Sequence, residues 1–256
     1  MSVKSIFRPP NRIVRYLVSD CGAQQCGHDQ GGICRFRAEG KDMPGTTMIE
    51  IRHKGTGEVI RQVEAASLAG QYFEGAKLEG ANFAGMELTG ADFQRADLRD
   101  ADFSNCKLDR ATFSGALLKG ATFDGASLLK ADFTDCFAQG SGFHGANLQG
   151  AVLRYAKFAE ADFSHANMTA VDISMAELAC DFTEANLTKA DIRGSNLAGA
   201  VLDGAILLGA NLSDAKLAGA DMGSAKVEGA LMGGGRRLGP QIFKKKEARP
   251  WWQFWS

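Results

Sequence analysis

The N-terminal part of the chain holds the one group of side chains whose types and spacing could do chemistry. Cys21, Cys26, His28 and Cys34 lie within fourteen residues of a glycine-rich stretch. Three thiolates and one imidazole can form a tetrahedral zinc site. The four residues between Cys21 and Cys26 are at the edge of the usual ligand spacing, and no second close cysteine pair follows. The alternative is a loop of reduced, partly buried thiols in a cytosolic protein.

Nothing else in the sequence suggests catalysis. The chain lacks a Gly-x-Ser-x-Gly elbow, a phosphate-binding Gly-x-x-x-x-Gly-Lys loop and a His-Glu-x-x-His helix. It also lacks a recognisable nucleic-acid-binding motif. The sequence therefore predicts a protein that is not an enzyme, that has no cofactor apart from a metal at the cysteine cluster, and that does not bind nucleic acid directly.

Any exposed functional residue must be positioned by a five-residue repeat that fills residues 66–232. Each repeat has a small residue, a polar residue, a central Leu or Phe, and two free positions. The centres recur every five residues from Leu68 to Leu178, giving 23 repeats, and from Phe182 to Met232, giving 11 more. One residue is missing between the two blocks, which predicts a kink or bulge between Leu178 and Phe182.

The period of five indicates a square coil. It suits neither a helix nor a strand, because the apolar positions would scatter around the first and alternate between the faces of the second. Leu and Phe centres also alternate from Leu68 to Phe133. In a coil of four repeats, residues ten apart lie on opposite sides, so Phe would occupy one facing pair of sides and Leu the other. About 34 repeats would then form a solid rod of roughly 40 Å.

The repeat resembles the pentapeptide-repeat family, whose preferred pattern is Ala-(Asp/Asn)-Leu-x-x. A direct match is Ala96-Asp97-Leu98-Arg99-Asp100, and the resemblance covers about two-thirds of the chain. It implies an all-β fold: a right-handed quadrilateral β-helix, or β-solenoid, of about 34 repeats.

Polar residues and glycines mark the expected corners of the coil. An Asp or Asn directly before a centre can accept a hydrogen bond from a backbone group two residues on. Such residues are Asn82, Asp92, Asp97, Asp102, Asn147, Asp162, Asn167, Asn186, Asp191 and Asn211. Glycine two residues after a centre suits a turn with positive φ. These glycines are Gly70, Gly75, Gly80, Gly85, Gly90, Gly115, Gly120 and Gly125.

The sequence divides into three parts. Residues 1–65 contain the Cys/His cluster and, over 48–66, two alternating strands around a glycine-rich turn, which predict a hairpin that caps the first coil. Residues 66–232 form the solenoid, and residues 233–256 form a basic, Trp-rich tail. No stretch has the apolar length of a transmembrane helix or a signal peptide, so we expect a cytoplasmic protein.

Charge is distributed unevenly along the chain. Residues 66–232 carry 13 basic and 22 acidic side chains, whereas both ends are net basic. An acidic rod could mimic nucleic acid toward a DNA-binding partner such as a type II topoisomerase. The alternative is that Asp is simply a good corner residue. The sequence shows no sign that the Asp residues gather on one face.

Three apolar residues interrupt the outward positions of the repeat. Leu117 and Phe137 replace the usual polar residue before the centre and lie one coil of twenty residues apart, and Tyr155 follows at the adjoining corner. An exposed apolar patch of this kind usually marks an interface. Alternatively, Phe137 turns inward to fill the gap beside the small centre Ala138.

The C-terminal tail combines a basic run with aromatic residues. Lys244–Lys246 and Arg249 precede Trp251, Trp252, Phe254 and Trp255. Such a tail could bind a protein partner through its indoles, cover the last coil of its own chain, or contact a membrane surface peripherally. The last coil ends at residue 232 and must pair with a second molecule, be covered by the tail, or fray. In the family, topoisomerase-protecting members are dimers joined at their C-terminal coils, so the resemblance implies a homodimer as one solution.

These observations favour a non-enzymatic interaction or scaffold protein that presents a rigid acidic solenoid and an aromatic basic tail to a protein partner. One alternative is a DNA-mimicking protein that protects a topoisomerase. Another is a metal-binding N-terminal module on a passive solenoid.

The metal alternative makes a direct prediction. If Cys21, Cys26, His28 and Cys34 bind zinc, protein purified under reducing, chelator-free conditions will carry near-stoichiometric metal by elemental analysis. A Cys26→Ser variant will lose that metal, because a tetrahedral site needs all four donors. Wild-type protein without near-stoichiometric metal would contradict the proposed zinc site.

Overall fold

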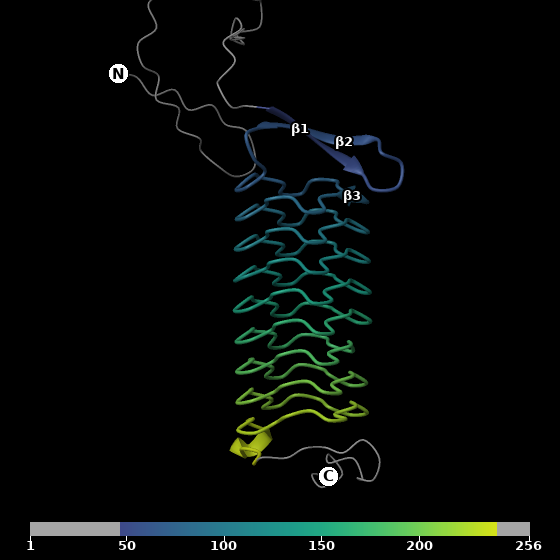
Figure 1. Cartoon of the computed structure of the whole chain (residues 1–256). Helices are drawn as coiled ribbons and strands as arrows, with labels where there is room; N and C mark the ends of the chain where they lie inside the picture. The colour runs from purple at the N-terminus through teal and green to yellow at the C-terminus, as the bar shows by residue number, and fades with distance from the viewer. Residues whose placement is uncertain (1–46, 240–256) are drawn as a thin grey trace, which may run out of the picture. The chain divides into compact units, whose positions relative to one another are not determined.

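The computed structural model describes residues 47–239 of the 256-residue chain. These residues belong to one compact unit and form a stack of coils (Figure 1). A β-hairpin lies at the N-terminal end of the stack, and a short 3-10 turn lies at its C-terminal end. No helix among residues 47–239 is long and apolar enough to cross a membrane.

Each coil has four sides, as the sequence predicted. Parallel bridges join residues twenty apart, and they fall into four columns that we call faces 1 to 4. Face 1 runs from Glu87 to Lys226, face 2 from Tyr72 to Leu231, face 3 from Lys77 to Lys216, and face 4 from Asn82 to Asp221. Since twenty residues contain four repeats, each repeat supplies one side and one corner.

The centres of the repeats fill the axis as ladders of like side chains. Phe73 stacks on Phe93 at 4.9 Å between ring centroids, and Phe83 meets Phe93 edge-on at 5.6 Å. One Phe ladder lies inside face 2 and the other inside face 4, and Leu fills the remaining pair, which confirms the predicted alternation. Aromatic contacts of this geometry add about 0.5–1.5 kcal/mol per pair to simple burial.

The corners are β-turns held by local hydrogen bonds. The Ala96 amide donates to the Phe93 carbonyl at 3.1 Å, and the Gln94 amide donates to the Asp92 carboxylate at 3.0 Å. All ten Asp and Asn residues predicted to accept from the amide two residues on do so. At most corners the residue two after the centre has positive φ, and all eight predicted glycines adopt it. Non-glycine residues in this position adopt the same conformation, with φ between 55° and 63°.

The missing residue between Leu178 and Phe182 is absorbed at a single corner. There the Cys180 amide donates to the Leu178 carbonyl at 2.8 Å, which makes a three-residue turn in place of a β-turn. The bridges across this coil join residues 19 apart, as in Asp162 to Asp181, and the step of twenty then resumes. The expected irregularity is therefore a tighter corner, and the ladders continue through it.

The N-terminal hairpin packs against the first coils. Strand β1 (Thr47–His53) pairs antiparallel with β2 (Val59–Ala65) and, on its other side, with β3 (Ala81–Asn82). Ile51 of β1 is fully buried in the core. The guanidinium of Arg61 lies 5.3 Å from the ring centroid of Phe73, the first member of its ladder.

The C-terminal end reverses direction through the 3-10 turn η1 (Gly233–Gly235). The Gly229 amide donates to the Leu238 carbonyl and the Leu238 amide donates to the Ala230 carbonyl, both at 2.8 Å. Residues 236–238 thus fold back on the last coil, which was one of the three alternatives for this end. The backbone amides of Leu217 and Met222 in the same coil have no hydrogen-bond partner among residues 47–239.

The corner conformation predicts opposite effects of glycine and alanine. Gly75 has φ 63° and open space around its missing Cβ, so Gly75→Ala should lower the free energy of unfolding by about 1–2 kcal/mol through backbone strain alone. Ala170 has φ 55°, so Ala170→Gly should raise it by up to about 1 kcal/mol. Denaturant unfolding measures both. As a control, Ala159→Gly, where φ is not positive, should destabilise slightly; stabilisation there would contradict the explanation.

Candidate functional site

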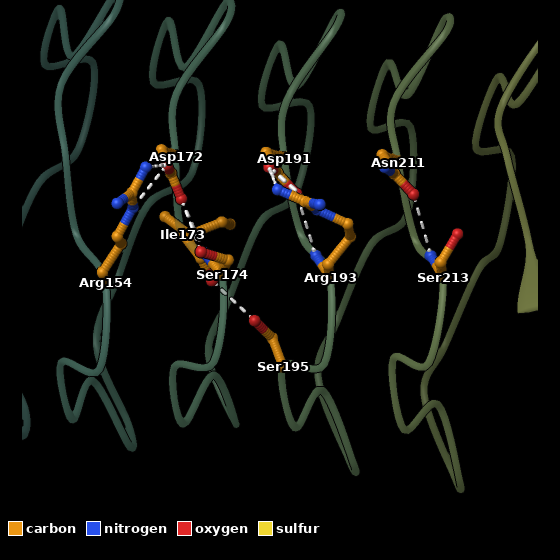
Figure 2. Close-up of polar contacts among 9 residues, drawn as sticks. All are labelled: Arg154, Asp172, Ile173, Ser174, Asp191, Arg193, Ser195, Asn211 and Ser213. Carbon is orange, nitrogen blue, oxygen red and sulfur yellow. Dashed lines mark hydrogen bonds and ion pairs between the residues drawn. The ribbon is translucent and has the colours of Figure 1, made fainter.

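The axis of the described solenoid is a packed interior whose polar groups are satisfied. Among residues 47–239 the buried polar side chains are Ser141 and Ser195. The Ser141 hydroxyl donates to the Ala138 carbonyl at 2.7 Å, and the Ser195 hydroxyl donates to the Ile173 carbonyl at 2.6 Å (Figure 2). Neither hydroxyl is therefore available for chemistry with a ligand.

The three cysteines of the solenoid are packing residues. Cys106, Cys136 and Cys180 are buried and occupy the small inward position of the repeat. Burial raises the pKa of Cys106 to about 11 and raises the pKa of Cys136 and Cys180 further. Since the thiolate is the reactive form, these thiols are inert at neutral pH.

The predicted metal ligands cannot be placed. Cys21, Cys26, His28 and Cys34 lie outside the described residues. Within residues 47–239 there is no group of three His, Cys, Asp or Glu side chains arranged to hold a metal ion. The aromatic tail residues Trp251, Trp252, Phe254 and Trp255 also lie outside the described part.

Leu117 and Phe137 are neighbours on face 3. They are partners in one parallel bridge, and each is 40% exposed. Phe137 therefore points outward, and the alternative in which it fills the gap beside Ala138 does not hold. The centre one coil further on inside the same face is Phe158, whose ring contacts the rings of Phe143 and Phe163.

Tyr155 and Met175 extend this surface along the corner between faces 2 and 3. They are 54% and 57% exposed and lie one coil apart. The thioether of Met175 lies over Gly194, where a Cβ would be 2.5 Å from its sulfur. We call Leu117, Phe137, Tyr155 and Met175 the apolar patch. Met175 was missed from sequence, although its spacing of twenty from Tyr155 is the signal that could have found it.

Lys157 borders the apolar patch. It is the bridge partner of Phe137 in the next coil, and its ammonium nitrogen lies 5.4 Å from the centroid of the Phe137 ring. A cation over an aromatic face fixes the ring in its outward orientation and adds a polar rim. The patch thus has the apolar centre and charged border of a protein interface.

Face 2 carries carboxylates that are paired with arginines (Figure 2). The Arg154 guanidinium donates to Asp172 at 2.6 Å, and the Arg193 guanidinium donates to Asp191 at 2.8 Å. Burial alone would raise the pKa of Asp172, but hydrogen bonds from Arg154 and Ser174 outweigh it and hold the pKa below its usual value. Arginines thus neutralise part of the negative charge on this face.

Face 4 is different, because its repeats contain no Lys or Arg. All thirteen Lys and Arg residues of 66–232 belong to repeats of the other three faces. The carboxylates on face 4 are Asp102, Asp124, Asp162, Asp181, Glu184, Asp203 and Asp221. The repeats of face 2 also contain seven carboxylates, so the acidic residues do not gather on one face, as the sequence predicted. Face 4 differs from face 2 because it lacks Lys and Arg.

Two histidines also meet on face 4. The rings of His144 and His165 are edge to face at 5.2 Å between centroids. The Nδ1 atom of His144 is 2.9 Å from the Ser164 hydroxyl, and that of His165 is 3.3 Å from Glu184. The structure thus brings two histidines together that are 21 residues apart in the sequence.

Comparison with known proteins shows the family to which the chain belongs. A family model described as "Pentapeptide repeat region" matches residues 62–133, and one described as "Pentapeptide repeats (8 copies)" matches residues 146–179, 178–197 and 195–234. Together they cover more than half of the chain. The protein is therefore a right-handed β-helical solenoid built from tandem repeats. It belongs to the pentapeptide-repeat family, as its repeats predicted, and this is a family of non-catalytic repeat proteins.

The solved structures that are similar to part of this chain include pentapeptide repeat proteins. HetL, a pentapeptide repeat protein involved in heterocyst differentiation regulation from the cyanobacterium Nostoc sp. strain PCC 7120, is 25% identical over 66% of this chain and 92% of its own, with a TM-score of 0.30. A trypsin-treated form of QnrB1, a plasmid-mediated fluoroquinolone resistance protein, is 21% identical over 63% and 80%, with a TM-score of 0.48. A thylakoid-lumen pentapeptide repeat protein from Arabidopsis thaliana is 27% identical over 44% and 66%, with a TM-score of 0.27. No curated protein matches the chain significantly.

Proposed function

We propose that this protein is a non-enzymatic interaction or scaffold protein that uses the apolar patch to bind a protein partner in the cytoplasm. The observation that carries the proposal is the exposure of Leu117, Phe137, Tyr155 and Met175 on adjoining coils. Contiguous exposed apolar surface on a soluble repeat protein marks an interaction site. Aromatic and Met side chains are also enriched at the centres of protein interfaces.

The solenoid suits this role because it holds the patch rigid. Every coil is hydrogen-bonded to the next, and the ladders leave the outward residues few ways to move. Binding of a partner therefore costs little free energy for ordering the side chains of the patch. The tail residues Trp251, Trp252, Phe254 and Trp255 offer further anchors of the kind that dominate binding energy.

The two ends of the solenoid have proposed roles of their own. The hairpin β1–β2 acts as a cap, because Ile51 and the pairing of β1 with β3 cover the first coils. At the other end, we propose that the last coil, which ends at Met232, pairs with that of a second copy of the chain to form a homodimer.

Substitution of the patch tests the proposed function. Wild-type protein, a triple patch variant (Leu117→Ser, Phe137→Ser, Tyr155→Asn) and a control variant (Val201→Ser, Leu208→Ser) are compared as baits in affinity capture from lysate of the source cells. Val201 and Leu208 are exposed apolar residues on other faces, each 37% exposed. Partners should be lost severalfold only from the patch variant, since removal of interface anchors raises the dissociation rate. Equal capture by all three baits would reject the patch as the binding surface.

A second candidate function rests on face 4. A surface with seven carboxylates and no Lys or Arg presents the charge of a nucleic-acid backbone to a cationic cleft. This supports a protein that mimics DNA and protects a type II topoisomerase. Such a partner would bind face 4 and would leave the apolar patch free.

A gyrase supercoiling assay with a fluoroquinolone present tests this candidate. Wild-type protein should restore supercoiling, and a face 4 variant (Asp102→Asn, Asp162→Asn, Asp181→Asn) should not, because it loses three charges. The matched control carries Asp132→Asn, Asp172→Asn and Asp191→Asn on face 2. Asn keeps the corner hydrogen bond at all six positions, so both variants should fold. No protection by the wild type, or equal loss in both variants, would reject DNA mimicry.

A further inference from the structure

The C-terminal tail is long enough for its aromatic residues to reach the apolar patch of the same chain. The described chain ends at Gly239, next to the last coil. Tyr155 and the last coil are separated by four steps of the stack, as in the bridges from Val152 to Leu231. At about 4.8 Å per step this is roughly 19 Å.

The tail has enough residues to cover this distance with slack. Twelve residues lead from Gly239 to Trp251, and an extended chain rises about 3.3 Å per residue, which gives a reach of roughly 40 Å. The aromatic residues of one molecule can therefore lie on the patch of the same molecule without any change in the solenoid.

The tail and the apolar patch are also alike in chemistry, because both present large apolar side chains. Trp251, Trp252, Phe254 and Trp255 carry the tail's large apolar surface, and the patch presents four exposed apolar side chains on successive coils. Between the last coil and the patch lie Asp214, on the corner between faces 2 and 3, and Glu177 and Lys216 on face 3, so this stretch of surface carries charges of both signs.

We propose that the C-terminal tail of this protein docks its aromatic residues on the apolar patch of its own chain. A tethered segment acts at an effective concentration of about a millimolar, so even weak contacts keep it bound. The tail then shields the patch from other surfaces, and a partner must displace it to bind. This consequence for partner binding rests on the proposed function, whereas the docking itself is independent of it.

The tryptophans make the inference directly measurable, because all three of the chain are in the tail. Intrinsic tryptophan emission and acrylamide quenching of the purified full-length protein therefore report only on the tail. Compared with a free peptide of residues 240–256, the full chain should emit at shorter wavelength and be quenched severalfold less. The triple patch variant should move toward the peptide in both measurements, and the Val201→Ser, Leu208→Ser control should not. Circular dichroism verifies that both variants are folded.

Four outcomes would overturn the inference. Peptide-like emission from the wild-type chain would show that the tail does not dock. An unchanged signal in the patch variant would place the tail elsewhere. If the emission becomes peptide-like in high salt but does not change in the patch variant, the basic run of the tail binds the acidic face 4 instead of the patch. A signal that appears only as protein concentration rises would make a second copy the occupant. Since these measurements use purified protein alone, their failure is distinguishable from failure of partner capture.

Discussion

The rest of the structure depends on the vertical stacking of identical side chains along the axis. Each Phe ring lies on the ring twenty residues away and meets the neighbouring ladder edge-on, as Phe93 does with Phe113 and Phe103. This geometry holds only if every coil has the same number of residues and the same shape. The backbone therefore repeats its corner conformation even where the residue is unsuited to it, as at Tyr155 with φ 60°. The gain from packing a large ring is greater than the roughly 1–2 kcal/mol cost of such a corner.

A solid axis leaves function to the outside of the coil. The inward hydroxyl of Ser195 is hydrogen-bonded to the backbone, and the inward thiols of the solenoid are protonated. The outward positions are free of packing constraints, so they differ from face to face. Face 2 pairs its carboxylates with arginines, face 3 carries Leu117 and Phe137, and face 4 carries acids without Lys or Arg. One uniform scaffold thus displays distinct surfaces a short distance apart.

Irregularities in the repeat are tolerated because each coil contacts only its neighbours. The deletion near Leu178 shortens one corner and changes the bridge step from twenty to 19 across one coil, after which the ladders resume. Likewise, the small centre Ala138 stays fully buried, and the centres of the coils on either side remain buried as well. In a globular core the same changes would disturb many partners at once, whereas in a solenoid the cost stays local.

The sequence by itself determined the repeat, the four-sided coil, the alternation of Phe and Leu ladders, and the corner roles of residues such as Asp92 and Gly75. These features follow from local spacing, because a period of five has only one regular solution that buries every centre. The adjacency of Leu117 and Phe137 was also predictable, since both lie in one block at a distance of one coil. The tertiary structure decided the rest. The acidic character of face 4 depends on register across the deletion, so that Asp162 and Asp181 share a face although they are 19 apart. The outward orientation of Phe137 and the fold-back of Leu238 onto Ala230 depend on volume and on free edges of the last coil, which are properties of neighbours distant in sequence.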